Sequence, residues 1–217
     1  MQKRRIGVLI SGRGSNLGAL IEAARDPGYP AEVVSVVSNR PDAKGLELAR
    51  SHGIPAHVID HKTFAGRDPF DQAVDRRLRD DGVEIVACAG FMRIMTDGLI
   101  AAWAGRMVNI HPSLLPLYRG LDTHARALAD GVRIHGCTVH FVTPELDSGP
   151  IIAQAAVPVL TGDTPDRLAA RVLTAEHRLY PMALALVATG AARLEGGKVR
   201  FKTKEEAGAP LFSPQPR

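Results

Sequence analysis

Two polar side chains stand two residues apart in a short apolar segment near the middle of the chain. Asn109 and His111 belong to the run 107–111 (MVNIH), which prolines follow at positions 112 and 116. Side chains two apart on an extended chain point to the same face, and Pro112 disfavours a helical His111. A carboxamide can donate to a developing oxyanion and an imidazole can move a proton. A capped strand end before a proline-stiffened loop explains these residues equally well.

A carboxylate further along the chain could complete this pair. Asp147 lies in the polar loop 143–149 that follows an apolar run at 137–142. If that run pairs with the strand of Asn109, Asp147 can reach His111 and favour the protonated imidazole, a usable general acid near neutral pH. A turn residue that bonds its own backbone is the commoner role of an isolated aspartate. His135 and His140 lack close metal-ligand spacing, so a metal site with His111 is not favoured.

A glycine-containing loop, 11–16 (SGRGSN), separates the first expected strand from the first helix. The backbone N–H groups of Gly14, Ser15 and Asn16 would open that helix and could bind a phosphate. The dinucleotide fingerprint is not met, because Leu17 takes its third glycine position. Arg40 leaves NADP open, but a monophosphate fits better. A glycine turn that only lets strand and helix pack closely is the alternative.

Two further stretches admit a binding role. The segment 89–95 (AGFMRIM) follows an apolar strand and could hold a flat heteroaromatic group, although an apolar strand end is at least as good an explanation. Glu176 and His177 form a polar pair on a largely apolar helix. A surface pair is the ordinary interpretation, and an acid that holds a substrate amine or hydroxyl is the other.

Composition indicates one globular domain. The chain has 217 residues, 45% of them hydrophobic, and a net charge of +4 from scattered basic residues, which gives little support for a nucleic-acid partner. The two cysteines, Cys88 and Cys137, lie in apolar runs without metal-ligand spacing, as in reduced cytoplasmic proteins. Neither a membrane span nor a signal peptide is expected.

The hydrophobic pattern predicts an α/β fold, because strands and helices alternate four times and so favour a parallel sheet. An antiparallel or mixed extension should follow, since no clear helix separates the last two strands. We expect strands at 6–11, 33–37, 55–59, 84–89, 107–110, 137–142 and 151–159, and helices at 17–25, 43–52, 69–81, 99–103, 125–129 and 164–188. Residues 210–217 are expected to form a loose tail.

Taken together and in order, these motifs resemble the glycinamide ribonucleotide formyltransferases, a folate-dependent family of purine synthesis. The resemblance covers about residues 6 to 190. The motifs are 10–17 (ISGRGSNL), 37–40 (VSNR), 89–94 (AGFMRI), 109–116 (NIHPSLLP), 120–124 (GLDTH), 135–142 (HGCTVHFV), 146–150 (LDSGP) and 176–177 (EH). The resemblance implies a Rossmann-like single domain over 1–190, with a mixed, mostly parallel sheet and helices on both faces. Residues 191–217 would be a C-terminal extension or tail.

The resemblance also implies a reaction. The amine of N1-(5-phospho-D-ribosyl)glycinamide attacks the formyl group of 10-formyltetrahydrofolate, with no metal and no covalent intermediate. Asn109 and protonated His111 stabilise the oxyanion, and Asp147 tunes His111 and helps to move the proton. Gly14, Ser15 and Asn16 of the N-terminal half bind the ribonucleotide, together with Glu176. The folate pocket, attributed mainly to the C-terminal half, takes Arg67, Met92, Arg93, Ile94, Met95, Asn109, Thr143, Pro144, Glu145, Leu146 and Asp147. The peptide before Pro116 tends to be cis.

Several rivals explain fewer of these features. A methionyl-tRNA formyltransferase carries a further tRNA-binding domain, for which little chain remains after the last helix. A formyltetrahydrofolate deformylase uses water as acceptor and usually has an additional N-terminal domain; it is the nearest alternative. A non-catalytic nucleotide-binding module has no need of Asn109, His111 and Asp147 together. The expected enzyme is a cytoplasmic monomer or homodimer.

Overall fold

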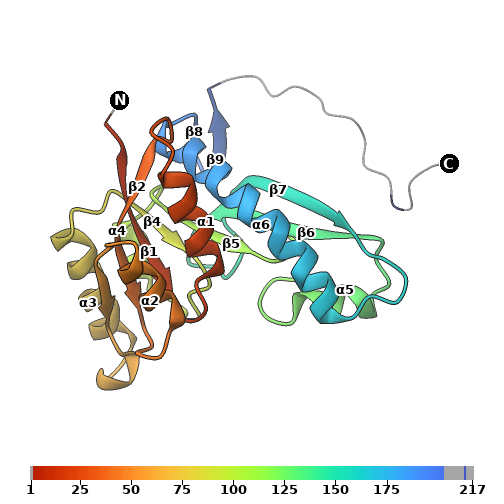
Figure 1. Cartoon of the computed structure of the whole chain (residues 1–217), viewed down its shortest axis with the longest axis horizontal. Coiled ribbons are helices and arrows are strands. Elements are labelled where there is room, and N and C mark those ends of the chain that lie inside the picture. The colour runs from red at the N-terminus through yellow and green to blue at the C-terminus, as the bar shows by residue number, and fades with distance from the viewer. Residues whose placement is uncertain (1, 203–212, 214–217) are drawn as a thin grey trace.

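Seven strands form one sheet in the spatial order β3-β2-β1-β4-β5-β6-β7 (Figure 1). The computed structural model describes residues 2–202 and residue 213. The strands are β1 (Arg4–Ile10), β2 (Ala31–Ser38), β3 (Ala56–Val58), β4 (Ile85–Cys88), β5 (Met107–His111), β6 (Ile134–Phe141) and β7 (Ile151–Pro158). All seven predicted strands are therefore present, with ends that differ by a few residues.

The sheet is mixed, as predicted. Strands β1 to β5 pair in parallel, whereas β6 is antiparallel to both β5 and β7. Parallel neighbours need long crossover connections, which the helices supply, while β6 and β7 need only a loop between them. The one reversed strand therefore lies directly beside the strand that carries Asn109 and His111.

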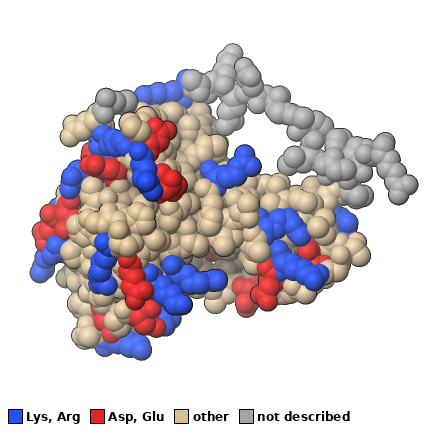
Figure 2. Space-filling model, in the orientation of Figure 1, with Lys and Arg blue, Asp and Glu red and all other residues tan. Residues whose placement is uncertain are grey.

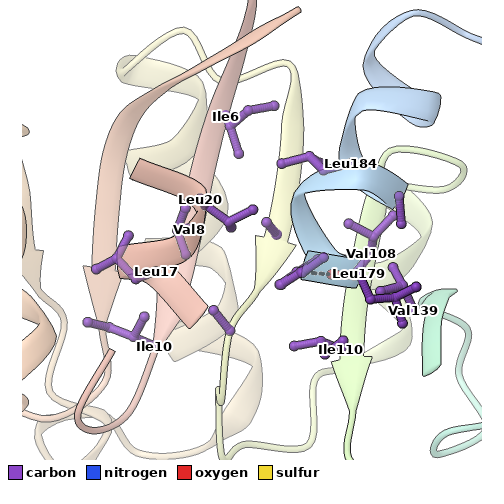
Figure 3. Packing of buried hydrophobic residues seen from close by; sticks show 14 of the residues in the cluster. Ile6, Val8, Ile10, Leu17, Leu20, Val108, Ile110, Val139, Leu179 and Leu184 are labelled. Carbon is purple, nitrogen blue, oxygen red and sulfur yellow. Dashed lines mark hydrogen bonds between the residues drawn. The ribbon is translucent and has the colours of Figure 1, made fainter. Parts of the chain in front are cut away.

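Helices cover both faces of the sheet. The apolar residues of α1 (Ser15–Ala24), α2 (Lys44–Ser51) and α6 (Pro165–Ala188) belong to one buried cluster, and those of α3 (Arg67–Asp80) and α4 (Asp97–Ala102) belong to the other. Helix α5 (Thr123–Ala129) packs against α6, and a short 3-10 turn, η1 (His61–Thr63), follows β3. Figure 3 shows Val108 and Ile110 of β5 in the first cluster, beside residues from α1 and α6.

Local sequence explains the two longest helices. Phe70, Val74 and Leu78 are buried on α3 at the four-residue spacing from which the helix was predicted. Helix α6 begins after Thr164, whose side chain accepts a hydrogen bond from the Arg167 N–H, and Pro165 occupies its first turn. Each helix therefore presents its apolar stripe to the sheet.

A C-terminal hairpin was not predicted. Strands β8 (Ala192–Glu195) and β9 (Lys198–Phe201) pair antiparallel within the expected extension 191–217. Between them, Gly196 and Gly197 have φ values of 56° and 74°, the left-handed conformation of a tight hairpin turn. Phe201 packs against the α1/α6 cluster, so the hairpin adds to the core. The expectation for 210–217 lies outside the described residues, apart from Ser213.

The charged side chains and the two cysteines lie where the sequence led us to expect them. Basic and acidic side chains are interspersed over the face seen in Figure 2. Cys88 and Cys137 are unpaired and buried, and burial raises the pKa of each thiol to about 12, with Glu176 adding to the effect at Cys137. In the described part of the chain, no helix combines the length and the apolar character needed to cross a membrane.

Candidate active site

The alternation of β5 places Asn109 and His111 on the face opposite to Val108 and Ile110. Those two apolar residues pack with α1 and α6, so their neighbours must point the other way. On the adjacent strand, His140 pairs with Asn109 and Thr138 pairs with His111. Asn109, His111, Thr138 and His140 thus share one face at the carboxyl end of β5, as the spacing predicted for the first two.

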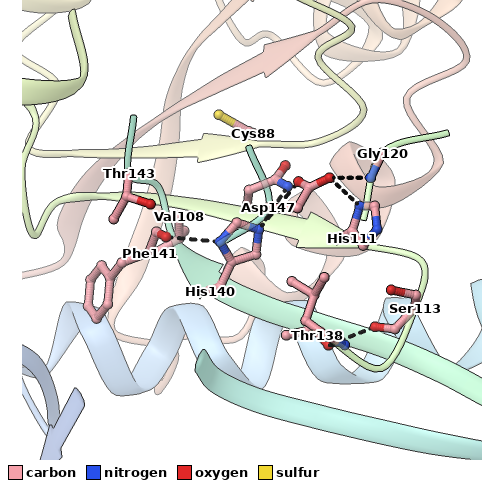
Figure 4. A network of polar contacts seen from close by, with 12 residues as sticks. Cys88, Val108, His111, Ser113, Gly120, Thr138, His140, Phe141, Thr143 and Asp147 are labelled. Atoms are coloured by element: carbon pink, nitrogen blue, oxygen red, sulfur yellow. Dashed lines mark hydrogen bonds and ion pairs between the residues drawn. The ribbon is translucent and has the colours of Figure 1, made fainter. Parts of the chain in front are cut away.

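Asp147 reaches this face from the loop that follows β6 (Figure 4). Its Oδ2 lies 3.3 Å from His111 Nδ1 and accepts a hydrogen bond of 2.9 Å from the Gly120 N–H. The backbone of Asp147 is left-handed, with φ 46°, a conformation that aspartate tolerates better than most residues. The structure therefore places Asp147 next to His111, which is the contact that the sequence analysis required for a catalytic pair.

The second ring nitrogen of His111 also faces an oxygen. Nε2 lies 2.9 Å from the carbonyl oxygen of Tyr118, while Nδ1 faces the Asp147 carboxylate. A carbonyl and a carboxylate only accept hydrogen bonds, so both ring nitrogens of His111 face acceptors. The side chains of His111 and Asp147 are 7% and 9% exposed. The pair is thus nearly buried and has a defined orientation.

His140 orients the carboxamide of Asn109, a role that was not anticipated. His140 Nδ1 lies 2.9 Å from the Phe141 carbonyl oxygen and therefore donates to it. Burial lowers the pKa of His140, which favours the neutral ring. Its Nε2 then accepts from Asn109 Nδ2 at 3.2 Å, which leaves the second N–H of that amide free. The contact between His140 and Asn109 follows from the pairing of β5 with β6, and the residue types alone do not reveal it.

Thr138 fixes the loop that leaves β5. Its buried hydroxyl donates to the Ser113 carbonyl oxygen at 2.7 Å and accepts from the Leu115 N–H at 3.0 Å (Figure 4). The Leu115–Pro116 peptide is cis, as the resemblance implied. Since Tyr118 and Gly120 follow in the same loop, Thr138 helps to set the two backbone groups that contact His111 and Asp147.

The glycine loop opens at the same edge of the sheet, at the carboxyl end of β1. Gly14 has φ 76°, and a Cβ there would lie 2.7 Å from the Gly45 Cα, so only glycine fits. It is also the N-cap of α1, and no side chain caps that helix. The N–H groups of Ser15 and Asn16 therefore begin a helix without a side-chain acceptor, the arrangement that binds phosphate in other proteins.

Asn16 and Glu176 meet although 160 positions separate them. Asn16 Nδ2 donates to Glu176 Oε2 at 2.7 Å, and Asn16 Oδ1 is buried without a partner among the described residues. Burial raises the pKa of the Glu176 carboxyl, and the bond from Asn16 only partly opposes this shift. Glu176 is therefore a buried acid facing the glycine-loop helix, not a surface residue.

The segment 92–95 presents apolar side chains outward. Met92 and Ile94 are each 62% exposed, unusual for residues of this kind. Arg93 lies over the Phe70 ring, 5.9 Å from its centroid, and its Nε is buried without a partner. Arg67 is exposed one turn before Phe70, at the start of α3. Arg67 and the 92–95 segment thus lie on the α3 side of the sheet.

The other candidate folate residues form the loop between β6 and β7. The Thr143 hydroxyl is half-buried and faces the Glu145 carbonyl oxygen at 3.4 Å. Pro144, Glu145 and Leu146 are exposed, and Glu145 pairs with Arg119 at 2.7 Å. This ion pair joins the loop to the segment that also supplies Tyr118 and Gly120.

Two more imidazoles lie close to the site. The rings of His124 and His135 are perpendicular, with centroids 5.3 Å apart. Burial, and secondarily His124, lowers the pKa of His135 to about 4, and burial also lowers that of His124. Both are therefore neutral at pH 7. Within residues 2–202 and 213, no group of three or more His, Cys, Asp or Glu side chains could hold a metal ion.

Comparison with known proteins relates this arrangement to one family. The family model described as formyl transferase matches residues 4–184. The chain is 47% identical to the phosphoribosylglycinamide formyltransferase of Escherichia coli (strain K12), over 85% of this chain and 87% of that protein. It is 51% identical to the trifunctional purine biosynthetic protein adenosine-3 of Gallus gallus over 92% of its own length, but it spans only 20% of that protein.

Solved structures agree with these sequence matches. The crystal structure of glycinamide ribonucleotide transformylase 1 from Symbiobacterium toebii superposes with a TM-score of 0.89 at 48% identity, covering 92% of this chain and 94% of that one. The phosphoribosylglycinamide formyltransferase of Coxiella burnetii superposes with a TM-score of 0.88 at 42% identity, covering 92% and 94%. The predicted fold class is thereby confirmed.

Proposed function

Because this chain belongs to the formyl transferase family, we propose that it carries a formyl group from 10-formyltetrahydrofolate to the amine of N1-(5-phospho-D-ribosyl)glycinamide. The products are formylglycinamide ribonucleotide and tetrahydrofolate, in de novo purine (IMP) biosynthesis. The observation that carries the proposal is the contact between His111 and Asp147, in which Nδ1 lies 3.3 Å from Oδ2. It lies at the sheet edge where the glycine loop also opens, since β1 and β5 run parallel to β4 between them.

The reaction is a direct acyl transfer. The amine nitrogen attacks the formyl carbon, and the carbonyl electrons move onto oxygen to give a tetrahedral oxyanion. Collapse of this intermediate re-forms the C=O bond and breaks the bond to N10 of the folate. One proton leaves the attacking nitrogen and one arrives at N10, so the proton count balances. Neither a metal nor an acyl-enzyme intermediate is part of the proposed route.

The side chains divide the work. The N–H of Asn109 that His140 leaves free donates to the oxyanion, together with protonated His111. His111 Nε2 is bonded to the Tyr118 carbonyl, so the oxyanion must replace that carbonyl as the acceptor. The Asp147 carboxylate keeps the ring charged and takes part in moving the proton to N10.

The remaining candidate residues bind the substrates. The phosphate binds to the backbone N–H groups of Gly14, Ser15 and Asn16, and Glu176 takes the glycinamide or ribose end. The folate lies against the 92–95 segment and the 143–147 loop, with Arg67 at the start of α3 near its anionic end. Cytoplasmic localisation and a monomeric or dimeric state remain predictions.

An absorbance assay tests the acceptor directly. Purified protein is given 10-formyltetrahydrofolate with and without glycinamide ribonucleotide. Release of tetrahydrofolate only when the ribonucleotide is present supports the proposal. Release without it would show that water is the acceptor, as in formyltetrahydrofolate deformylase. No release from folded protein would favour a binding module.

A further inference from the structure

A chain of hydrogen bonds, in each of which a side chain takes part, crosses the carboxyl ends of four neighbouring strands. His61 follows β3, Asn39 follows β2, Ser11 follows β1 and Met92 lies shortly after β4. The sheet order β3-β2-β1-β4 places these four ends side by side. The chain therefore connects the loop expected to bind phosphate with the segment expected to bind folate.

Ser11 is the central member of this chain. Its hydroxyl donates to Asn39 Oδ1 at 2.5 Å and accepts from the Met92 N–H at 2.7 Å. Ser11 and Asn39 are 5% and 2% exposed, so the bond between their side chains is shielded from water. With Oδ1 assigned by Ser11, Asn39 Nδ2 faces His61 Nδ1 at 3.2 Å. His61 Nδ1 is also 2.9 Å from the Asn39 carbonyl oxygen, so either ring tautomer has a partner.

The 92–95 segment is held at both ends by side-chain acceptors. Ser11 Oγ accepts from the N–H of Met92, the first residue of the segment, and Asp71 Oδ2 accepts from the N–H of Thr96, directly after it, at 2.6 Å. The side chains of Met92 and Ile94 are exposed. Phe91 and Met95 pack against the buried cluster of α3 and α4, but the exposed Met92 side chain adds little, so the backbone position at Met92 depends on its bond to Ser11.

The glycine loop has supports of its own. The Ser11 N–H bonds to the Gly90 carbonyl at 3.1 Å, the Gly45 N–H bonds to the Gly12 carbonyl at 3.1 Å, and the Gly18 N–H bonds to the Gly14 carbonyl at 2.9 Å. None of these bonds uses the Ser11 side chain. Loss of the hydroxyl therefore affects the Met92 side more than the loop to which Ser11 belongs.

We infer that Ser11 is a positioning residue for the folate segment, although it lies in the phosphate loop. It acts through the Met92 N–H and touches neither substrate. This inference rests on the proposed function, since it takes 92–95 as part of the folate pocket. Its distinctive consequence is that a change in the phosphate loop alters the use of the other substrate.

Steady-state kinetics of Ser11→Ala test this role. The variant leaves the Met92 N–H without its acceptor, and we expect the KM for 10-formyltetrahydrofolate to rise about tenfold. The KM for glycinamide ribonucleotide should change less than about twofold, and kcat less than about threefold, because the other anchors remain. Equal rises in both KM values, or an unchanged folate KM, would overturn the inference.

Ser38→Ala is the matched control. Ser38 is also a fully buried serine at a strand end, and its hydroxyl likewise donates to a carbonyl and accepts from a backbone N–H. Both of its bonds stay within its own turn, to Arg40. We expect a loss of stability similar to that of Ser11→Ala but wild-type KM values. A raised folate KM in Ser38→Ala would mean that any buried hydroxyl here has this effect, and the inference would fail.

Amide hydrogen exchange separates this inference from the proposed function. In Ser11→Ala we expect exchange at Met92 to accelerate about tenfold, while Thr96, held by Asp71, keeps its wild-type rate. Unchanged exchange at Met92 contradicts the positioning role even if the enzyme is active. Inactive wild-type protein contradicts the proposed function, yet the exchange result still decides whether Ser11 holds Met92.

If Ser11→Ala folds too poorly, Ser11→Cys, a weaker acceptor of similar size, should shift Met92 exchange in the same direction.

Discussion

The two corners of the candidate site are built in different ways. The glycine-loop corner offers backbone N–H groups at the start of α1, placed by the left-handed backbone of Gly14 and by its close packing against Gly45. The His111 corner offers side chains from β5, β6 and the loop after β6, and bonds between distant positions hold them, from Asn109 to His140 and from Gly120 to Asp147. The first corner thus depends on backbone conformation and close backbone packing, whereas the second depends on strand register. The first should fail through backbone strain and the second through lost charge or orientation.

The largest difference between the two corners is expected when His111 is replaced. We expect His111→Ala to lower kcat by about 10³-fold, because the oxyanion loses a charged donor and the proton loses a carrier. Binding of the ribonucleotide, measured by calorimetry, should stay within about threefold of wild type, since the other corner is intact. His52→Ala, which removes an exposed histidine on another element, is the control. Near-normal turnover of His111→Ala would refute the mechanism.

Asp147→Asn removes charge while it keeps shape. Asparagine tolerates the left-handed backbone and still accepts from the Gly120 N–H, so the loop should remain in place. We expect kcat to fall by about 10², because His111 loses the carboxylate that faces its Nδ1. A kcat within about twofold of wild type would show that the charge of Asp147 has no part in the reaction.

Gly14→Ala should damage the other corner selectively. Alanine would have to adopt φ 76° with its Cβ 2.7 Å from Gly45, a strain of about 1–3 kcal/mol. The KM for the ribonucleotide should rise about tenfold, and the folate KM should stay within about twofold. Gly12→Ala is the matched control, because a Cβ at Gly12 meets nothing within 4 Å. Equal effects of the two substitutions would show that strain at Gly14 is not the cause.

The smallest expected effect concerns stability near the His111 corner. Burial lowers the pKa of His135 from 6.5 to about 4, so between these pH values the folded state binds fewer protons than the unfolded chain. The free energy of unfolding should therefore fall as the pH drops from about 6.5 to about 4. In His135→Gln this fall should be smaller by about 1–3 kcal/mol in urea titrations. An identical pH dependence in variant and wild type would show that His135 does not contribute.

The fold and the residue types of the site could be predicted from the sequence, whereas most contacts between the site residues could not. Strand and helix periodicity located every strand of the main sheet, and the glycine at position 14 marked a close approach. The orientation of Asn109 by His140 depends on a register between strands 31 positions apart. The contact between Ser11 and Met92 spans 81 positions and involves no unusual residue type, so no local pattern marks it.

The hairpin was missed for a different reason. Its turn, Gly196–Gly197, is a recognisable signal, but four-residue strands carry little alternation, and Gly-rich ends of chains commonly form loops. Its apolar residues acquire meaning only from the cluster on which they pack. Long-range packing, not local propensity, decides this element.

Cys88 and Cys137 give the chain an experimental convenience. They are its only cysteines, both are buried, and both have pKa values raised to about 12, so neither presents a thiolate at neutral pH. Alkylating reagents should leave the folded protein unmodified. A single cysteine introduced at an exposed position such as Leu121 would then be the one reactive thiol for attaching a fluorophore. Such a probe would report on the segment around Tyr118 and Gly120 without prior removal of the native cysteines.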